Sequence, residues 1–141
     1  MRRNAAFGAA LGALALAQLV PVERSNPPVE TEVPAPTAVR AILERSCYDC
    51  HSLATRWPWY SRVAPVSWLV AYDVEHAREH LNFHTWNRYD ADERREKLEE
   101  LWEEVEKGAM PLWYYLPLHP RARLSEGDKE ILRGWALSPP E

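Results

Sequence analysis

The sequence predicts an all-α protein, a small bundle of about four helices, and three observations lead to that prediction. Apolar residues recur at helical spacing in several segments, and two of these segments follow a helix-capping pattern. No segment alternates polar and apolar residues over a length that indicates a strand. Hydrophobic residue types make up 46% of the 141 residues, with seven Trp, which is enough for one core in a single domain.

The first twenty residues have the composition of a signal peptide or an N-terminal membrane anchor. Arg2 and Arg3 precede residues 5–20, an uncharged run rich in Ala and Leu. Residues 15–17 have the small-x-small form of a cleavage site, which would start the mature chain at Gln18. The run is shorter than the roughly 20 residues of a spanning helix, so cleavage is favoured and a retained anchor stays open. Either reading places the domain in the periplasm or cell envelope, tethered to the inner membrane if the segment is kept.

Residues 21–36 contain five of the twelve prolines, several charges and few large apolar residues. This composition predicts an extended, solvated linker that holds the domain away from the membrane or the cleavage site. The domain itself is expected over residues 37–141. Thr37 is expected to cap a first helix that carries the chain to Cys47.

A loop and a second helix are expected next. Residues 52–65 hold two prolines and three large aromatic residues without a clear period, which indicates a structured loop. The second helix should begin near Pro65 or Val66. Its apolar residues recur at helical spacing and predict one buried face: Val66, Leu69, Val70, Val74, Ala77 and Leu81.

Two capped helices complete the predicted bundle. Asp90 should cap a helix over residues 91–107, and Gly108 should end it as the C′ glycine. The predicted inner face of this helix carries Leu98, Leu101, Trp102 and Val105. After a loop over residues 109–124, Ser125 and Asp128 form the S-x-x-D pattern of a last helix. That helix is expected to bury Ile131, Leu132 and Trp135.

Both cysteines of the chain lie in Cys47-Tyr48-Asp49-Cys50-His51, a C-x-x-C-H pattern. This pattern is the attachment signature of a c-type haem. Two residues between the thiols let both sulfurs reach the two vinyl-derived carbons on one edge of a porphyrin, and the following histidine then binds the iron. The predicted cofactor is a covalent haem c with its iron.

Three readings without haem stay open for the two cysteines. A thioredoxin-like dithiol also uses C-x-x-C, but it is found in a βαβ setting that this sequence does not predict. A structural disulfide would fit an oxidising compartment, although it would not require His51. A zinc site would need further ligands, and the sequence holds no second cysteine pair.

Met110 is the candidate for the sixth iron ligand. It is the one methionine besides Met1, and it lies between a helix-ending glycine and Pro111, which stiffens the loop. The alternative is that Met110 simply fills the core. His119, in the same loop, is the rival ligand, with a surface histidine before a proline as its simpler interpretation.

Other side chains near the motif suggest secondary roles. His76, His80 and His84 recur every four residues, which resembles a metal pair on a helix, but a solvated histidine face is the favoured interpretation. Arg56 and Arg62 are candidates to pair with haem propionates. A backbone carbonyl near Pro58 or Pro65 is expected to hold the second ring nitrogen of the proximal histidine. Six aromatic residues are expected to form a dry crevice: Trp57, Trp59, Tyr60, Trp113, Tyr114 and Tyr115.

The charge balance argues against a nucleic-acid partner. Without Arg2 and Arg3, 15 basic residues stand against 21 acidic ones, a net charge of −6. Phosphate binding requires clustered Lys and Arg. A mildly acidic domain would instead be steered toward basic protein surfaces.

Four runs of the sequence resemble a known family over about residues 37–137: SCYDCHSLATRWPWYSRVAPVSWLVAYDV, LNFHTW, GAMPLWYYLPLHPRARLS and LRGWA. They are similar to the bacterial haem-binding domain family of small envelope proteins, described as monohaem cytochromes c. The resemblance implies haem c on Cys47 and Cys50, with His51 as axial ligand. The Met110-Pro111 pair matches the family's own M-P.

The expected protein is therefore a monomeric monohaem c-type cytochrome of the envelope. It would pass single electrons between redox partner proteins that the sequence does not identify, without transforming a substrate. The alternative is a haem-based redox or gas sensor in which Met110 leaves the iron.

Overall fold

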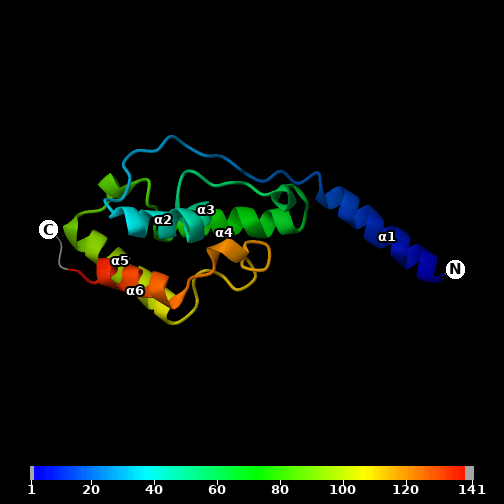
Figure 1. The fold of residues 1–141 in the computed structure, drawn as a ribbon. Helices are drawn as coiled ribbons and strands as arrows, with labels where there is room; N and C mark the ends of the chain where they lie inside the picture. Colours follow the sequence, from blue (N-terminus) through cyan, green and yellow to red (C-terminus); the bar gives the residue numbers. More distant parts are fainter. Residues whose placement is uncertain (1, 139–141) are drawn as a thin grey trace.

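The computed structural model describes residues 2–138, and its regular elements are all helical (Figure 1). This confirms the predicted fold class. The described residues form no strand, only an isolated bridge between Thr31 and Thr85. The α-helices are α1 (Arg2–Ala17), α2 (Thr37–Ser46), α3 (Tyr48–His51), α4 (Val66–His80), α5 (Ala91–Glu106) and α6 (Glu126–Ala136). Three 3₁₀ helices lie between them: η1 (Trp59–Arg62), η2 (Trp86–Arg88) and η3 (Pro120–Ala122).

Local capping explains the ends of α5 and α6. Asp90 accepts hydrogen bonds from the backbone of Asp92 and Glu93, and Glu93 reciprocates in a capping box. Gly108 has φ of 73°, a conformation that favours glycine, so its predicted C′ role is confirmed. The Ser125 box before α6 is confirmed as well. The prediction that Thr37 caps the first helix of the domain is wrong. Pro36 occupies the N-cap position of α2, and its side chain makes no hydrogen bond.

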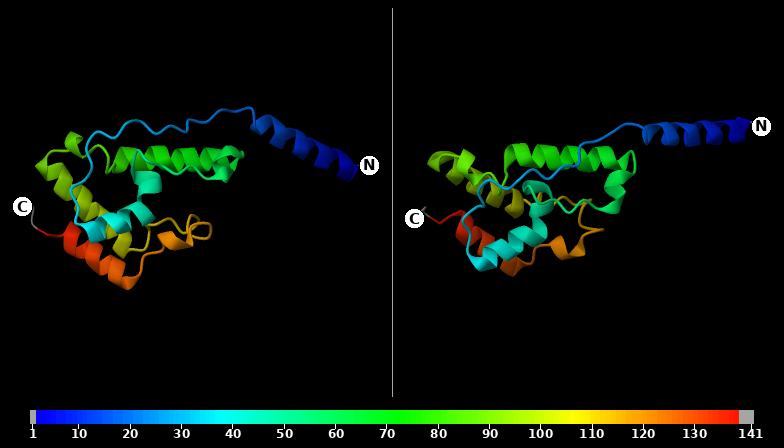
Figure 2. Two further views of the ribbon diagram at one scale, coloured as in Figure 1. Left: turned by 45° about the horizontal axis from the view of Figure 1, so that its top comes forward. Right: turned by 90° about the horizontal axis from the view of Figure 1, so that it is seen from above.

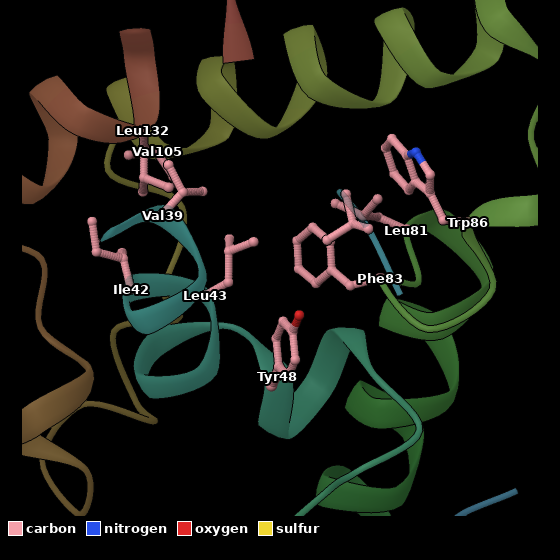
Figure 3. Packing of buried hydrophobic residues seen from close by; sticks show 10 residues of the cluster. Val39, Ile42, Leu43, Tyr48, Leu81, Phe83, Trp86, Val105 and Leu132 are labelled. Carbon is pink, nitrogen blue, oxygen red and sulfur yellow. The ribbon is translucent and has the colours of Figure 1, made fainter. Parts of the chain in front are cut away.

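The core lies where α2 and α3 meet α5 and α6 (Figure 3). Leu43 of α2, Leu132 of α6 and Phe83 from the loop after α4 are fully buried. The predicted inner face of α5 is confirmed, since Leu98, Leu101, Trp102 and Val105 all belong to or pack against this core. On α6, Leu132 and Trp135 face inward as predicted, but Ile131 is 42% exposed.

The predicted buried face of α4 is only partly correct. Val74 is buried, but Val66 and Leu69 are 43% and 47% exposed. In the first turn Ser67 faces inward in place of these apolar residues. Helical spacing alone gives an apolar stripe, and it does not show that a neighbouring element covers both ends of it.

Residues 22–35 are extended and mostly exposed, as predicted for the linker, but they form a strap that lies along the domain and is hydrogen-bonded to it instead of holding it at a distance (Figure 2). The Val33 N–H donates to the Phe83 carbonyl at 2.8 Å, and the Val33 side chain is 1% exposed. Arg78 of α4 donates to the Ser25 carbonyl and to the Asn26 side chain, both at 3.1 Å. The strap is therefore part of the folded domain.

The N-terminal helix α1 extends away from the rest of the domain (Figures 1 and 2). Its side chains Phe7, Leu11 and Leu14 are 68%, 52% and 50% exposed. Among the described residues no helix has both the length and the apolar character needed to cross a membrane.

Candidate functional site

A cavity of about 720 Å³ opens between α3, α4, α5 and the loop after α5. Cys47, Cys50, His51 and Met110, the four predicted site residues, all line it. Much of the remaining wall is apolar and comes from Leu81, Phe83, Leu101, Val105, Leu112 and Leu124. Residues from both ends of the domain thus converge on one apolar space.

The backbone of the C-x-x-C-H segment forms one turn of its own. The chain leaves α2 at Cys47 and forms α3, in which the N–H groups of Cys50 and His51 donate to the Cys47 carbonyl at 3.1 and 2.9 Å. Residues three and four apart in a helix lie on the same side. The turn therefore presents both thiols and the imidazole to the same cavity.

His51 is oriented by a backbone carbonyl at the end of α4. Its Nδ1 lies 3.0 Å from the Leu81 oxygen, to which it donates, so Nε2 keeps its lone pair free for a metal. Burial lowers the pKa of His51, although the hydrogen bond to Leu81 acts in the opposite direction. The prediction that a carbonyl near Pro58 or Pro65 holds this nitrogen is wrong. Because α4 lies alongside α3, the Leu81 carbonyl reaches the imidazole instead.

The two thiols are half-buried at the cavity wall. Burial raises the pKa of both Cys47 and Cys50 to about 12, and mutual repulsion or nearby carboxylates add to the effect. Both thiols are therefore neutral at pH 7. A redox dithiol depends on a thiolate with a depressed pKa, so the local electrostatics disfavour that reading.

Asp49, between the cysteines, joins the motif to the second loop. The Tyr115 hydroxyl donates to Asp49 at 2.8 Å, and the Arg56 Nε donates to the same carboxylate at 3.0 Å. Arg56 is thus engaged with the motif itself, and neither it nor Arg62 lines the cavity. The structure gives no support to their predicted role with propionates.

Met110 is held by the end of α5. Its N–H donates to the Glu104 carbonyl at 3.1 Å, and its half-buried side chain packs against the core while lining the cavity. His119 does not line the cavity, because its ring is stacked on Tyr115 at 4.0 Å and its Nε2 lies 2.6 Å from the Tyr60 hydroxyl. The geometry therefore favours Met110 over His119 as the second ligand.

The aromatic residues divide between the cavity and the surface. Tyr114 and Tyr115 line the cavity, but Trp59 and Trp113 are 77% and 79% exposed and contribute nothing to it. Trp57 and Tyr60 also lie outside it. The ring that sequence reasoning missed is Phe83, which stacks on Tyr48 with ring centroids 5.5 Å apart (Figure 3). Its centroid also lies 6.2 Å from that of His51.

The three regularly spaced histidines do not share one face. His76 and His80 lie on α4 at the cavity edge with their Nε2 atoms 3.2 Å apart. His84 follows the helix and is buried, where its Nδ1 accepts from the Leu53 N–H at 3.2 Å. In the described part of the chain, no group of three or more His, Cys, Asp or Glu residues could hold a metal ion.

The residues of the cavity fit the haem that the motif predicts. A volume of 720 Å³ falls within the range of about 300–1,000 Å³ for cofactor pockets. The walls are apolar, two thiols lie on one turn, and His51 offers a free Nε2. This donor set suits a porphyrin iron better than a closed zinc shell, which needs four ligands.

Comparison with known proteins agrees with this fit. A family model described as a haem-binding domain matches residues 12–138. The match includes the end of α1 and the strap as well as the cavity residues. No curated protein and no solved structure matches the chain.

Proposed function

Because the chain belongs to the haem-binding domain family, we propose that it is a monohaem c-type cytochrome that passes single electrons between redox proteins of the cell envelope. Haem binding follows from the family. Covalent attachment and electron transfer are our inference. The observation that carries it is the convergence of Cys47, Cys50, His51 and Met110 on one apolar cavity.

The bound haem supplies one-electron redox chemistry. Cys47 and Cys50 would hold it through thioether bonds, and His51 would bind the iron with the ring nitrogen that is not hydrogen-bonded to Leu81. Met110 is the proposed sixth ligand. Phe83 and Leu101 give the cavity apolar walls, which would disfavour the added charge of ferric iron and raise the reduction potential.

The proposed location is the envelope, with α1 as a signal segment or a membrane tether. The helix is uncharged from residue 5 onward, and its apolar side chains have no cover in the domain. No substrate is transformed in this proposal. The partners are redox proteins that meet the acidic domain in transient encounters.

Expression with a haem-maturation system tests the attachment. We expect the purified full chain to gain the mass of one haem and to retain haem stain on a denaturing gel. Cys47→Ser with Cys50→Ser should remove both signals, while His76→Ala, at the cavity edge but outside the motif, should keep them. A colourless wild type with the mass of the bare polypeptide would contradict the proposal. High-spin, carbon-monoxide-reactive protein would instead identify the sensor.

A further inference from the structure

The segment from η1 to the first turns of α4 has its polarity reversed. Its small residues Ser61, Ala64 and Ser67 are buried, at 0%, 6% and 4% exposure. Its large apolar residues are exposed instead, and we call four of them the η1 face: Trp59, Val63, Val66 and Leu69, exposed by 77%, 45%, 43% and 47%. Soluble surfaces rarely gather apolar side chains in this way unless something covers them.

The η1 face lies where the N-terminal helix joins the domain. The Gln18 side chain, directly after α1, donates to the Ala64 carbonyl at 3.2 Å and accepts from the Ala64 N–H at 3.0 Å. Arg24 donates to the Ser61 carbonyl at 3.1 Å. Figures 1 and 2 show α1 leaving the molecule beside η1 and the start of α4. Whatever holds α1 therefore lies next to the η1 face.

The charge of this region differs from that of the rest of the chain. Residues 50–72 contain Arg56 and Arg62 but no Asp or Glu, although the chain holds 21 acidic residues. Arg62 is exposed, whereas Arg56, also exposed, is ion-paired with Asp49, so the charge offered to an anionic surface is that of Arg62. Basic side chains are attracted to anionic lipid headgroups, and tryptophan is enriched at the membrane–water interface. A basic redox protein would be drawn more strongly to the glutamates of α5 than to this segment.

We infer that the η1 face rests on the anionic surface of the bilayer that holds α1. The inference rests on the membrane tether in the proposed function and is independent of the haem chemistry. Trp59 and Val63 enter the interface, and Arg62 meets the headgroups. The hydrogen bonds between Gln18 and Ala64 join the end of α1 directly to the domain. The membrane that holds α1 is therefore also the membrane that the η1 face contacts.

Hydroxyl-radical footprinting of the matured full chain tests this contact. The chain is mixed with vesicles of phosphatidylethanolamine and phosphatidylglycerol, recovered by flotation, and compared with the lipid-free chain. Oxidation of Trp59 should fall about fivefold, since a side chain 77% exposed in solution becomes mostly covered. Oxidation of Ile131 on α6 and of Leu137 directly after it, 42% and 48% exposed, should stay unchanged.

A pair of matched variants gives a second measurement. Trp59→Ser with Val63→Ser should weaken vesicle binding at limiting lipid roughly tenfold, because two interfacial side chains are lost. Ile131→Ser with Leu137→Ser should bind like the wild type. If the chain floats with the vesicles but oxidation of Trp59 does not fall, the contact of the η1 face with the membrane is overturned, while the tether through α1 is retained. Failure to float would overturn both, and haem content would still report separately on the cytochrome.

Discussion

Replacing Phe83 by alanine tests the wall that the core shares with the haem site. The ring is 0% exposed, stacks on Tyr48 and meets His51 edge-on. The backbone of Phe83 donates to the His51 carbonyl at 2.9 Å and accepts from Val33 at 2.8 Å. These two bonds survive the substitution, so the loss reports on the side chain alone.

The expected cost follows from complete burial. Removing a fully buried phenylalanine costs about 3–5 kcal/mol, because apolar burial is lost and a cavity remains. That is a large share of the roughly 5–15 kcal/mol that stabilises a domain. Phe83→Leu keeps most of the volume and should cost less than about 1.5 kcal/mol.

Urea unfolding of the haem-loaded chain, followed by circular dichroism, measures both variants. With an urea m-value of about 2 kcal/mol per molar, the alanine variant should unfold at roughly 2 M less urea than the wild type. The same variant should have a lower reduction potential, because water gains access beside His51. A loss below about 1 kcal/mol for alanine, or equal losses for alanine and leucine, would refute this packing.

Three further predictions concern the ligand and the polar contacts. Met110→Ala should abolish the sulfur-to-iron absorption band of the oxidised protein, whereas His119→Ala should keep it; a band that survives in the first variant would reject the assignment. Tyr115→Phe should destabilise the domain by about 1.5–3 kcal/mol in thermal or urea unfolding, since it removes a hydrogen bond to the Asp49 carboxylate, and no change beyond that of Tyr72→Phe, a ring 60% exposed, would argue against this contact. Burial raises the pKa of Asp128, but hydrogen bonds from Ser125 and the ion pair with Arg45 outweigh it and lower the pKa below its usual 3.8. Asp128→Asn should therefore cost about 1 kcal/mol at neutral pH, and the difference from wild type should close as the pH falls below 3.8; a gap that is constant from pH 7 to pH 3 would contradict this.

The features that could be predicted from the sequence are those that depend on near neighbours in the chain. The boxes at Asp90 and Ser125 and the C′ role of Gly108 are local contacts with residue-specific requirements. The C-x-x-C-H turn is local as well. Its placement with Met110 at one cavity agrees with the proposed ligands.

The features that could not be predicted depend on what packs against what. Leu81 orients His51 through its backbone carbonyl, and a backbone acceptor has no signature in the sequence. Arg56 carries a charge suited to a propionate, but in the fold its guanidinium donates a hydrogen bond to the Asp49 carboxylate instead. Val66 and Leu69 have the spacing of a buried stripe, and only the absence of a covering element among the described residues leaves them exposed.

The bonded strap limits how far the haem can travel. A free linker of 16 residues would let the domain range over about 20–24 Å from its attachment point. Here hydrogen bonds of Gln18, Arg24 and Val33 fasten that length of chain to the domain, so in the proposed tethered cytochrome the haem would stay at a fixed distance from the membrane. In the proposed cytochrome, an electron donor or acceptor would therefore have to diffuse to the domain.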